Sequence, residues 1–256
     1  MFGEVADLYD RARPSYPPEL VDHLVALTPS EAPGRVLDVG CGTGKATVLL
    51  AARGLTGVGL EPDPAMAAAA ERNLAAFEAW SLVVTDFEDY AGDTAAPFDL
   101  ITCAQAWHWL DPAQRFQHAA RLLRPRGWLA LFWNRTGDDS SPIRRDVDAV
   151  YAELFPGLSP HGTLTIGHPP VGAPTPEAGF RQSSWQLFTW VRRYTAAEWT
   201  DLAQTHSDHR LIRPDQREVL LARLAEVIDS HGGFYDHPYE TWLWTAQLDS
   251  PEARNE

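Results

Sequence analysis

The chain has 256 residues and carries 21 basic against 35 acidic side chains, for a formal net charge of −14 at pH 7. That length suits one large α/β domain, or a domain with a cap. The negative charge argues against a nucleic-acid backbone as a partner, which leaves a small molecule or another protein.

No apolar run approaches the length of a transmembrane helix, and the opening MFGEVADLYD is acidic where a signal peptide would be basic and then apolar. The two cysteines, Cys41 and Cys103, show neither a disulfide framework nor a paired metal spacing, which fits a reducing compartment. We therefore expect a cytoplasmic protein with no membrane partner.

Residues 1–15 are rich in aromatic and arginine side chains and precede a helix with Leu20, Leu24 and Leu27 on its apolar face. Aromatic and basic residues ahead of the first strand need a reason. One explanation is an arm that packs on the edge of the sheet and leaves its arginines in water. The other is contact with a ligand.

Residues 35–45, RVLDVGCGTGK, predict a buried parallel strand, a glycine turn and the start of a helix. Glycine lets the backbone approach a ligand closely, and a helix N-terminus offers free N–H groups. A Walker A phosphate loop is excluded because Val39 and Ala46 stand where it requires Gly and Ser or Thr. The NAD-type fingerprint is weakened but stays open, because the glycines occupy its first, third and fifth positions and Lys45 the sixth.

Helices and strands then alternate. A crossover helix is predicted over residues 43–53 and a second strand over 56–60, which ends at Glu61. An Asp-Pro pair begins the next helix, because Asp is a good N-cap and Pro suits the first helical position. A third strand over 81–84 leads to Asp86.

The stretch VLDVGCGTG, followed by Glu61 at the end of the next strand, resembles the nucleotide-binding signature of class I S-adenosylmethionine-dependent methyltransferases. The resemblance covers residues 1–135 well and the rest by architecture. It implies an α/β fold with a Rossmann-like, doubly wound, mostly parallel seven-stranded sheet, an antiparallel edge strand and an insertion after the fifth strand. It also implies S-adenosyl-L-methionine as cofactor and S-adenosyl-L-homocysteine as product. The alternative is an ordinary βα turn beside a solvated Glu.

The resemblance also implies roles for individual residues. Glu61 would accept hydrogen bonds from both ribose hydroxyls, and Asp86 would face the exocyclic amine of adenine unless it is a cap or turn residue. The segment YDRARPSYP would fold over the methionine end, so that Tyr9 and Arg13 meet its carboxylate. The predicted cofactor-binding residues are Tyr9, Arg13, Gly40, Cys41, Gly42, Gly44, Glu61, Pro62, Asp86, Phe87, Ala104 and Gln105.

The fourth predicted strand, residues 98–103, runs into AQAWHWLDP at a strand end, where ligands collect in open parallel sheets. Trp107, Trp109 and, from the fifth strand, Trp133 are predicted to wall an acceptor pocket. His108 is the only histidine placed near the expected sulfonium, so it is the candidate catalytic residue. The alternative is that these aromatic residues are packing and the histidine is merely hydrogen-bonded.

A capping box with proline at Asp111 predicts the next helix, and a fifth strand is predicted over 128–133. An insertion follows, with a helix begun by Ser141 and then a loop over 156–179 that is dense in Pro and Gly. Later elements are a strand over 180–194, a helix capped by Thr195 and Glu198, a helix over 214–230 and a strand over 239–247.

The predicted organisation is a cofactor-covering segment over 1–30, a cofactor-binding core over 31–135, an acceptor lid over 136–179, the C-terminal part of the core over 180–248 and a tail over 249–256. The histidines of the 156–179 loop lack carboxylate or cysteine partners at ligand spacing. His206 and His209 are three residues apart near a helix end, a spacing that more often marks an exposed turn. No metal is predicted.

A sulfonium is already an activated electrophile, so the protein mainly has to position a nucleophile and exclude water. The Trp-His-Trp sequence resembles the subgroup of trans-aconitate methyltransferases, which favours a small-molecule or natural-product acceptor with a carboxylate oxygen as the candidate atom. A carboxylate is nucleophilic at neutral pH, whereas a hydroxyl or amine would need His108 as a base. The alternatives are a non-catalytic nucleotide-binding sensor and an NAD-dependent oxidoreductase. The protein is expected to be a monomer or homodimer that does not bind nucleic acid.

Overall fold

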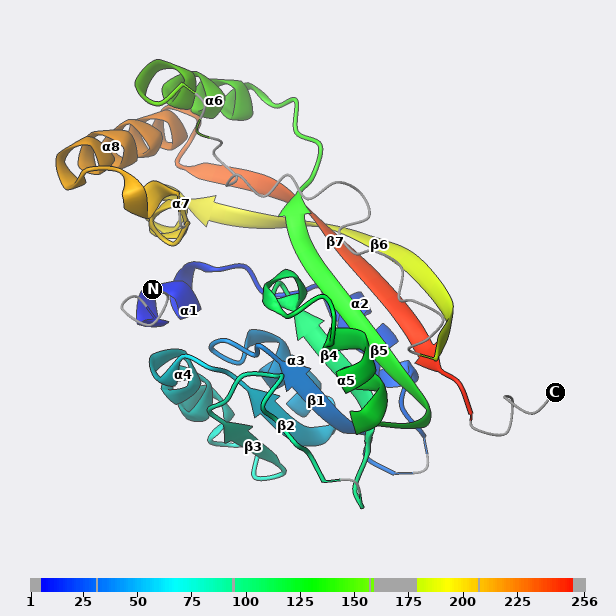
Figure 1. Ribbon diagram of the computed structural model, residues 1–256. Coiled ribbons are helices and arrows are strands. Elements are labelled where there is room, and N and C mark those ends of the chain that lie inside the picture. Colours follow the sequence, from blue (N-terminus) through cyan, green and yellow to red (C-terminus); the bar gives the residue numbers. More distant parts are fainter. Residues whose placement is uncertain are drawn as a thin grey trace.

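A computed structural model describes residues 6–30, 32–93, 95–156, 158, 179–206 and 208–250. Seven strands form one sheet: β1 (Arg35–Val39), β2 (Thr56–Leu60), β3 (Trp80–Val83), β4 (Phe98–Ala104), β5 (Leu123–Thr136), β6 (Phe180–Thr195) and β7 (Phe234–Leu248). Their order across the sheet is β3-β2-β1-β4-β5-β7-β6. The first five strands are parallel to one another, and β7 runs antiparallel to both β5 and β6. This is the predicted mostly parallel, doubly wound sheet, and its antiparallel strand lies one place in from the edge strand β6 (Figure 1).

The helices of the described residues are α1 (Ala6–Ala12), α2 (Pro18–Ala26), α3 (Lys45–Ala51), α4 (Pro64–Leu74), the 3-10 turn η2 (Trp107–Trp109), α5 (Arg115–Leu122), α6 (Pro142–Leu154), α7 (Ala196–Gln204), the 3-10 turn η4 (His209–Leu211) and α8 (Pro214–Ser230). None of them is long and apolar enough to cross a membrane. The predicted loop over 156–179 lies almost entirely outside the described residues, as does the tail from residue 251.

Three predicted helix starts carry the expected caps. The Asp63 carboxylate accepts a hydrogen bond from Ala65 N at 2.9 Å, and Ser141 Oγ accepts one from Arg144 N at 3.2 Å. Thr195 and Glu198 form the reciprocal capping box that their spacing predicts. Each of these helices therefore begins where the local sequence satisfies its first free N–H groups.

The start predicted at Asp111 was wrong. The Asp111 carboxylate accepts from Ala113 N at 2.9 Å and from the Gln114 side-chain amide at 2.7 Å, so it caps a turn. Helix α5 begins four residues later, at Arg115, after an N-cap that has no side-chain bond. The Gln side chain binds the Asp carboxylate instead of reaching back to the backbone, which removes one half of the capping box.

Apolar side chains cover both faces of the sheet. On one face α2 and α3 pack against Val36, Leu100 and Phe132. On the other face α5 packs against the alternating residues Leu37 and Ile101. Strands buried on both faces read as continuous apolar runs, which is why residues 36–39 were recognisable as a parallel strand.

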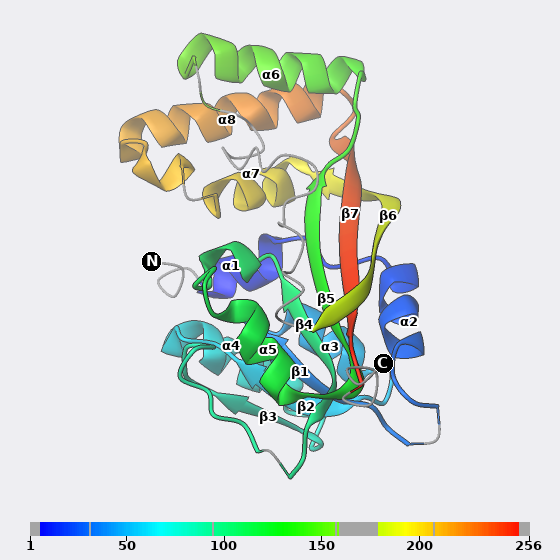
Figure 2. The same ribbon diagram turned by 45° about the vertical axis from the view of Figure 1, so that its right-hand side comes forward.

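Strands β5 and β7 are longer than predicted, and one end of each continues beyond the end of β4. The last β4 residue, Ala104, pairs with Phe132, whereas the β5–β7 pairing continues to Thr136 and Tyr239. Around these projecting ends α6, α7 and α8 enclose a separate apolar cluster. We call these three helices, η4 and the ends of β6 and β7 that pack against them the cap. Figures 1 and 2 show the cap helices gathered at one end of β6 and β7, away from β1, β2 and β3.

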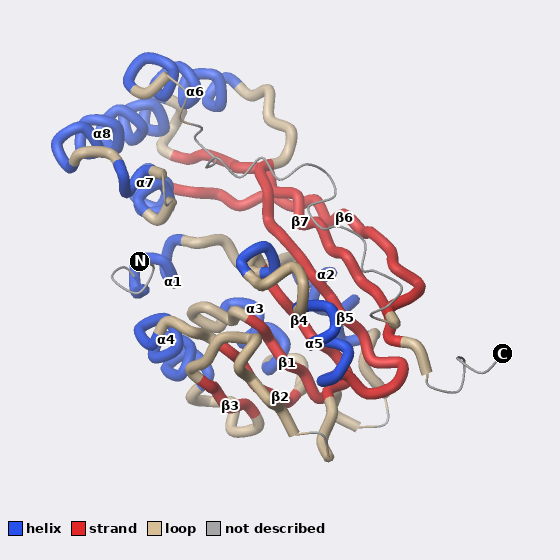
Figure 3. Tube along the Cα trace, viewed as in Figure 1, coloured by secondary structure: helices blue, strands red, loops and turns tan. Residues whose placement is uncertain are grey.

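Helix α1 lies between the cap and the Rossmann-like half (Figure 3). Asp7 pairs with Arg72 of α4 at 2.6 Å, and Arg11 pairs with Asp201 of α7 at 3.3 Å. Because these ion pairs are largely exposed, each adds little stability. Their effect is to place the N-terminal segment across the gap between the two halves.

Candidate active site

One cavity of about 880 Å³ opens at the carboxyl ends of the parallel strands. It lies beside β1. From β1 the sheet continues to β2 and β3 on one side and to β4 and β5 on the other, and open α/β sheets bind ligands where the strand order reverses in this way. Its wall comes from the glycine turn, the ends of β2, β4 and β5, the N-terminal segment, and the cap elements α7 and β7. The cavity therefore spans both halves of the molecule.

The glycine turn after β1 has a backbone that other residues would adopt only with strain. Gly40, Gly42 and Gly44 have φ angles of 64°, 60° and 82°. A Cβ on Gly40 would stand 2.6 Å from the Cβ of Ala106, whereas Gly44 precedes α3 and faces Ala70 of α4. Gly40 and Gly42 line the cavity and Gly44 does not.

Glu61 is fixed at the rim of this turn. One carboxylate oxygen accepts a hydrogen bond from Gly42 N at 2.9 Å and the other accepts one from Asp63 N at 3.0 Å. Burial raises the pKa of Glu61 and the two backbone bonds lower it. A carboxylate has about four lone-pair positions, so two remain for the paired hydroxyls of a ribose.

Asp38, beneath the glycine turn, is a feature that sequence reasoning missed. Its fully buried carboxylate accepts hydrogen bonds from Thr47 Oγ1 at 2.5 Å and Thr102 Oγ1 at 2.8 Å. Burial raises its pKa to about 6, against the lowering effect of the two hydroxyls. The carboxylate ties β1 to α3 and β4, so it holds the turn without touching the cavity. The only signal was a charged residue within an apolar strand.

Carboxylates also follow the third strand. Asp86 lines the cavity and its charge acts on Glu61, while Phe87 borders the cavity with only 3% of its surface exposed. Cys41 and Pro62, also predicted, line the same end. Together with the turn, these groups fit an adenosine, since they offer acceptors for hydroxyl and amine groups beside backbone that comes close.

Gln105 follows β4 in a left-handed conformation, with φ at 62°. Such a backbone is strained for a residue with a side chain and persists only when its surroundings impose it. Gln105 N donates to Phe132 O at 3.0 Å, and its side-chain amide donates to Asn134 O at 3.4 Å. This left-handed conformation turns the chain so that Ala104 and Gln105 both line the cavity.

The Trp-His-Trp turn divides its three residues between cavity and core. His108 and Trp109 line the cavity, and Trp109 is 72% exposed at its mouth. Trp107 is 1% exposed and packs against Phe87 and Phe116, so it belongs to the core and not to the predicted pocket wall. In a strand Trp107 and Trp109 would point to the same side. In the 3-10 turn η2 they point in different directions.

His108 is half-buried, and neither ring nitrogen has a hydrogen-bond partner among the described residues. Burial, and after it the positive charge of Arg115, lowers the pKa of the imidazole below 6.5. The ring is therefore neutral at pH 7 and has a nitrogen able to take a proton.

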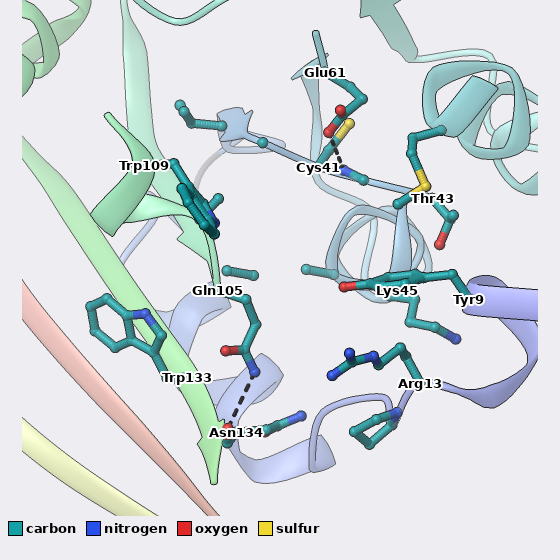
Figure 4. A pocket seen from close by; sticks show the side chains of 18 of the residues that line it. Tyr9, Arg13, Cys41, Thr43, Lys45, Glu61, Gln105, Trp109, Trp133 and Asn134 are labelled. Atoms are coloured by element: carbon teal, nitrogen blue, oxygen red, sulfur yellow. Dashed lines mark hydrogen bonds between the residues drawn. The ribbon is translucent and has the colours of Figure 1, made fainter. Parts of the chain in front are cut away.

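The fifth strand supplies Trp133, Asn134 and Arg135 to the cavity. Trp133 is 2% exposed, and its indole N–H has no partner within the described part of the chain. Figure 4 shows Trp109 and Trp133 on one side of the cavity, facing Tyr9, Arg13 and Lys45 on the other. The cap completes the wall with Trp199, Leu202, Ala203, His206, His237 and Tyr239.

The N-terminal segment is held over the cavity by backbone contacts. Arg13 Nη2 donates to Thr205 O at 2.9 Å, and its guanidinium lies 5.1 Å from the centre of the Tyr9 ring. Asn134 Nδ2 donates to Ser15 O at 2.8 Å. The structure thus brings Tyr9 and Arg13 into the cavity wall, where an arm packed on the sheet edge would not have placed them.

A three-residue chain behind the cavity fixes Asn134. Trp190 Nε1 donates to Thr241 Oγ1 at 2.8 Å, and that hydroxyl donates to Asn134 Oδ1 at 2.6 Å. The chain links β6, β7 and β5 to the N-terminal segment. None of these partners is close in sequence, so no local pattern could have predicted the arrangement.

His206, Asp208 and His209 lie close enough to hold a cation in principle. However, both nitrogens of the buried His209 ring are engaged, Nε2 with Tyr151 Oη at 2.7 Å and Nδ1 with Asp208 Oδ1 at 2.8 Å. The cluster acts as a link between α6 and η4.

Comparisons with known proteins indicate the family of this chain. A family model described as a methyltransferase domain matches residues 37–131. An uncharacterized methyltransferase of Mycobacterium tuberculosis is 43% identical over 133 residues, which cover 52% of this chain and 51% of that protein, about half of its length. An uncharacterized methyltransferase-like protein of Schizosaccharomyces pombe is 30% identical over 242 residues, or 88% of this chain and 84% of that protein.

Among solved structures, a putative type II methyltransferase from Anaeromyxobacter dehalogenans has the same fold, with a TM-score of 0.65. It is 23% identical in sequence, and the match covers 93% of this chain and 97% of that one. The similarity therefore includes the cap as well as the region that the family model matches.

Proposed function

This chain belongs to the class I S-adenosylmethionine-dependent methyltransferases, and we propose that it transfers a methyl group to a small-molecule acceptor. One observation carries the proposal. Glu61, anchored by Gly42 N, borders a positive-φ glycine turn at one end of a cavity whose other end is aromatic and enclosed by the cap. Such a cavity has room for a nucleoside and a second molecule together.

The residues of the core half fit the cofactor. Glu61 would hold the ribose and Asp86 the adenine amine, while Arg13 would face the methionine carboxylate. When bound, S-adenosylmethionine supplies a methyl group on a positively charged sulfur, which needs no further activation.

The remaining work falls to the acceptor side. Trp109 and Trp133 would orient the acceptor, and the N-terminal segment and the cap would exclude water. Ala104 and Gln105 would bind the methionine part of the cofactor. We favour a carboxylate oxygen as the methylated atom, because a carboxylate is already ionised and nucleophilic at neutral pH. No proton then has to be removed.

For a hydroxyl or amine acceptor a base is required, and His108 is our candidate. Its lowered pKa keeps the ring neutral at pH 7, and its nitrogens have no partner within the described residues. The His108 ring would take the acceptor proton as the new bond to the methyl group forms.

The test offers the protein a panel of small carboxylic acids, phenols and amines together with S-adenosylmethionine that carries a labelled methyl group. Transfer of the label and formation of S-adenosylhomocysteine are measured. We expect turnover with at least one class. His108→Ala should leave acid methylation intact and abolish the pH dependence of hydroxyl or amine methylation. Failure of the parent to bind S-adenosylhomocysteine would contradict the proposal, and stabilisation by NAD alone would favour an oxidoreductase.

A further inference from the structure

Lys45 is the only lysine of the chain, which carries the rest of its basic side chains as arginine. It is the first residue of α3, directly after the glycine turn, and it lines the cavity together with Tyr9 and Arg13. Figure 4 shows these three side chains on the same side of the cavity, opposite Trp109. An ammonium group on a flexible stem therefore stands in the part of the wall that the N-terminal segment covers.

The charge of Lys45 is only partly compensated in the fold. Its Nζ lies 3.8 Å from Oδ1 of Asp10 on α1, which makes an ion pair but is longer than a hydrogen bond. An ammonium group has three N–H donors, so a pair of this length leaves donors for a second acceptor. Burial lowers the pKa of Lys45 more than Asp10 raises it, and the charge of Arg192 lowers it further. The ammonium form would thus gain from another carboxylate nearby.

Two arginines beside the N-terminal segment bind backbone oxygens. Arg13 Nη2 donates to Thr205 O at 2.9 Å, and Arg192 Nη1 donates to Arg13 O at 3.3 Å. Arg192 does not line the cavity. Arg13 Nε has no partner among the described residues, so this guanidinium still has a donor to offer to a ligand. Arg13 and Lys45 are therefore two cations of the wall that can share one anionic group.

We propose, on the premise that the chain is a methyltransferase, that Lys45 binds the methionine carboxylate of S-adenosylmethionine jointly with Arg13. The Lys45 ammonium is then shared between that carboxylate and Asp10, so that occupation of the cavity and docking of α1 depend on the same charge. Lysine suits this role because a point charge on a flexible stem can face two carboxylates, whereas the planar fork of arginine fixes the direction of its donors.

The rival explanation is that Lys45 serves only to hold α1 against the core through Asp10. A residue with that task need not line the cavity. The neighbouring ion pair of α1, Asp7 with Arg72 at 2.6 Å, lies outside the cavity wall. The two explanations differ in the ligands that they affect. Docking of α1 acts on every ligand of the cavity, whereas a carboxylate contact acts only on ligands that have a carboxylate.

The experiment compares three ligands by isothermal titration calorimetry on the full chain without an acceptor. S-adenosylmethionine has the carboxylate, its decarboxylated form lacks only that group, and methylthioadenosine lacks the whole amino-acid part. The parent should bind S-adenosylmethionine about tenfold or more tightly than the decarboxylated form. Lys45→Met should remove most of that preference and leave the affinity for methylthioadenosine unchanged, which also shows that the variant is folded. A preference that stays at the parent's value in Lys45→Met would overturn the proposal.

Two variants of the contacts of α1 separate the explanations. Asp10→Asn removes the competing carboxylate, so the preference for S-adenosylmethionine over its decarboxylated form should match or exceed that of the parent. A preference that falls as it does in Lys45→Met would show that Lys45 acts only through α1, and would overturn the proposal. Arg72→Met is the matched control, because it removes the pair with Asp7 on the same helix. It should change the affinities for both ligands by the same factor.

The single lysine also gives a direct spectroscopic readout. A chain labelled with isotopic lysine shows one ε-methylene signal in nuclear magnetic resonance spectra, that of Lys45. The pKa of Lys45, followed through that signal, should rise when S-adenosylhomocysteine binds and stay unchanged when methylthioadenosine binds. Equal responses to the two ligands would contradict a carboxylate contact.

The same measurements separate this proposal from the one on which it rests. If the parent binds none of the adenosyl ligands, the methyltransferase proposal itself fails. If the parent prefers S-adenosylmethionine to the decarboxylated form and Lys45→Met keeps that preference, the carboxylate belongs to Arg13 and only the assignment of Lys45 fails.

Discussion

In the core half of the cavity the polar groups are carboxylates and backbone N–H groups, whereas in the cap half they are indole and imidazole rings and guanidinium groups. Each half also buries a titratable side chain whose pKa burial shifts, upward in one half and downward in the other. Asp38 lies under the glycine turn, and burial raises its pKa to about 6. His237 lies among the aromatic rings of the cap, and burial lowers its pKa to about 3. The two halves should therefore respond to acid in opposite directions.

The largest expected effect comes from the glycine turn. Gly40→Ala adds a Cβ 2.6 Å from that of Ala106 at a φ of 64°, so S-adenosylhomocysteine should bind about a hundredfold more weakly or worse. Gly54→Ala is the matched control, because it has a φ of 83° and nothing within 4 Å of the new Cβ. It should lose about 1 to 2 kcal/mol of stability with unchanged affinity. Equal affinities in the two variants, measured by calorimetry, would refute the close approach at Gly40.

The cap should lose stability in acid. The folded pKa of His237 lies below its usual 6.5, so the unfolded chain takes up a proton that the folded chain refuses as pH falls from 6.5 toward 3. Between about pH 7 and 4 this linkage should lower the free energy of unfolding by about 3 kcal/mol. His237→Gln should remove that slope in urea titrations. An unchanged slope would show that the imidazole is not buried as described.

The core should behave in the opposite way, with a smaller effect. The folded pKa of Asp38 is above its usual 3.8, so its contribution to stability is complete below that value and is lost as pH rises toward 6. Between about pH 4 and 6 this linkage should lower the parent's free energy of unfolding by about 2 kcal/mol. Asp38→Asn removes the titrating group, so the variant should not show that decrease. Denaturant titrations of parent and variant over that range would measure it. Parallel curves would mean that Asp38 titrates normally.

The same contrast explains what could be predicted from sequence. The core half comes from short contiguous signals, such as the glycines of residues 40–44 and the acidic residue after β2, because strand ends and turns are locally encoded. The cap half depends on the β5–β7 pairing continuing to Thr136 and Tyr239, which brings together residues a hundred positions apart. No periodicity specifies that extension. Trp199 and Tyr239 accordingly line the cavity without having been predicted.

The smallest expected effect tests how the cap half supports the N-terminal segment. Thr241→Val removes the hydroxyl between Trp190 Nε1 and Asn134 Oδ1, which should cost about 1 kcal/mol of stability. It should also weaken the binding of S-adenosylhomocysteine severalfold, because Asn134 holds Ser15 and with it the N-terminal segment over the cavity. Thr245→Val is the control, since its hydroxyl bonds to Ser184 on the same two strands and away from the cavity. Equal ligand affinity in both variants would show that the chain of bonds does not support the site.

The central claim is that Glu61 holds the ribose of an adenosyl ligand beside the glycine turn. Calorimetric titration of the parent and of Glu61→Ala with S-adenosylhomocysteine tests it most directly, with NAD as the competing ligand. We predict that the parent binds S-adenosylhomocysteine in preference to NAD and that the variant loses about tenfold or more in affinity. A parent that ignores S-adenosylhomocysteine, or a variant that binds it as tightly as the parent, would contradict the claim.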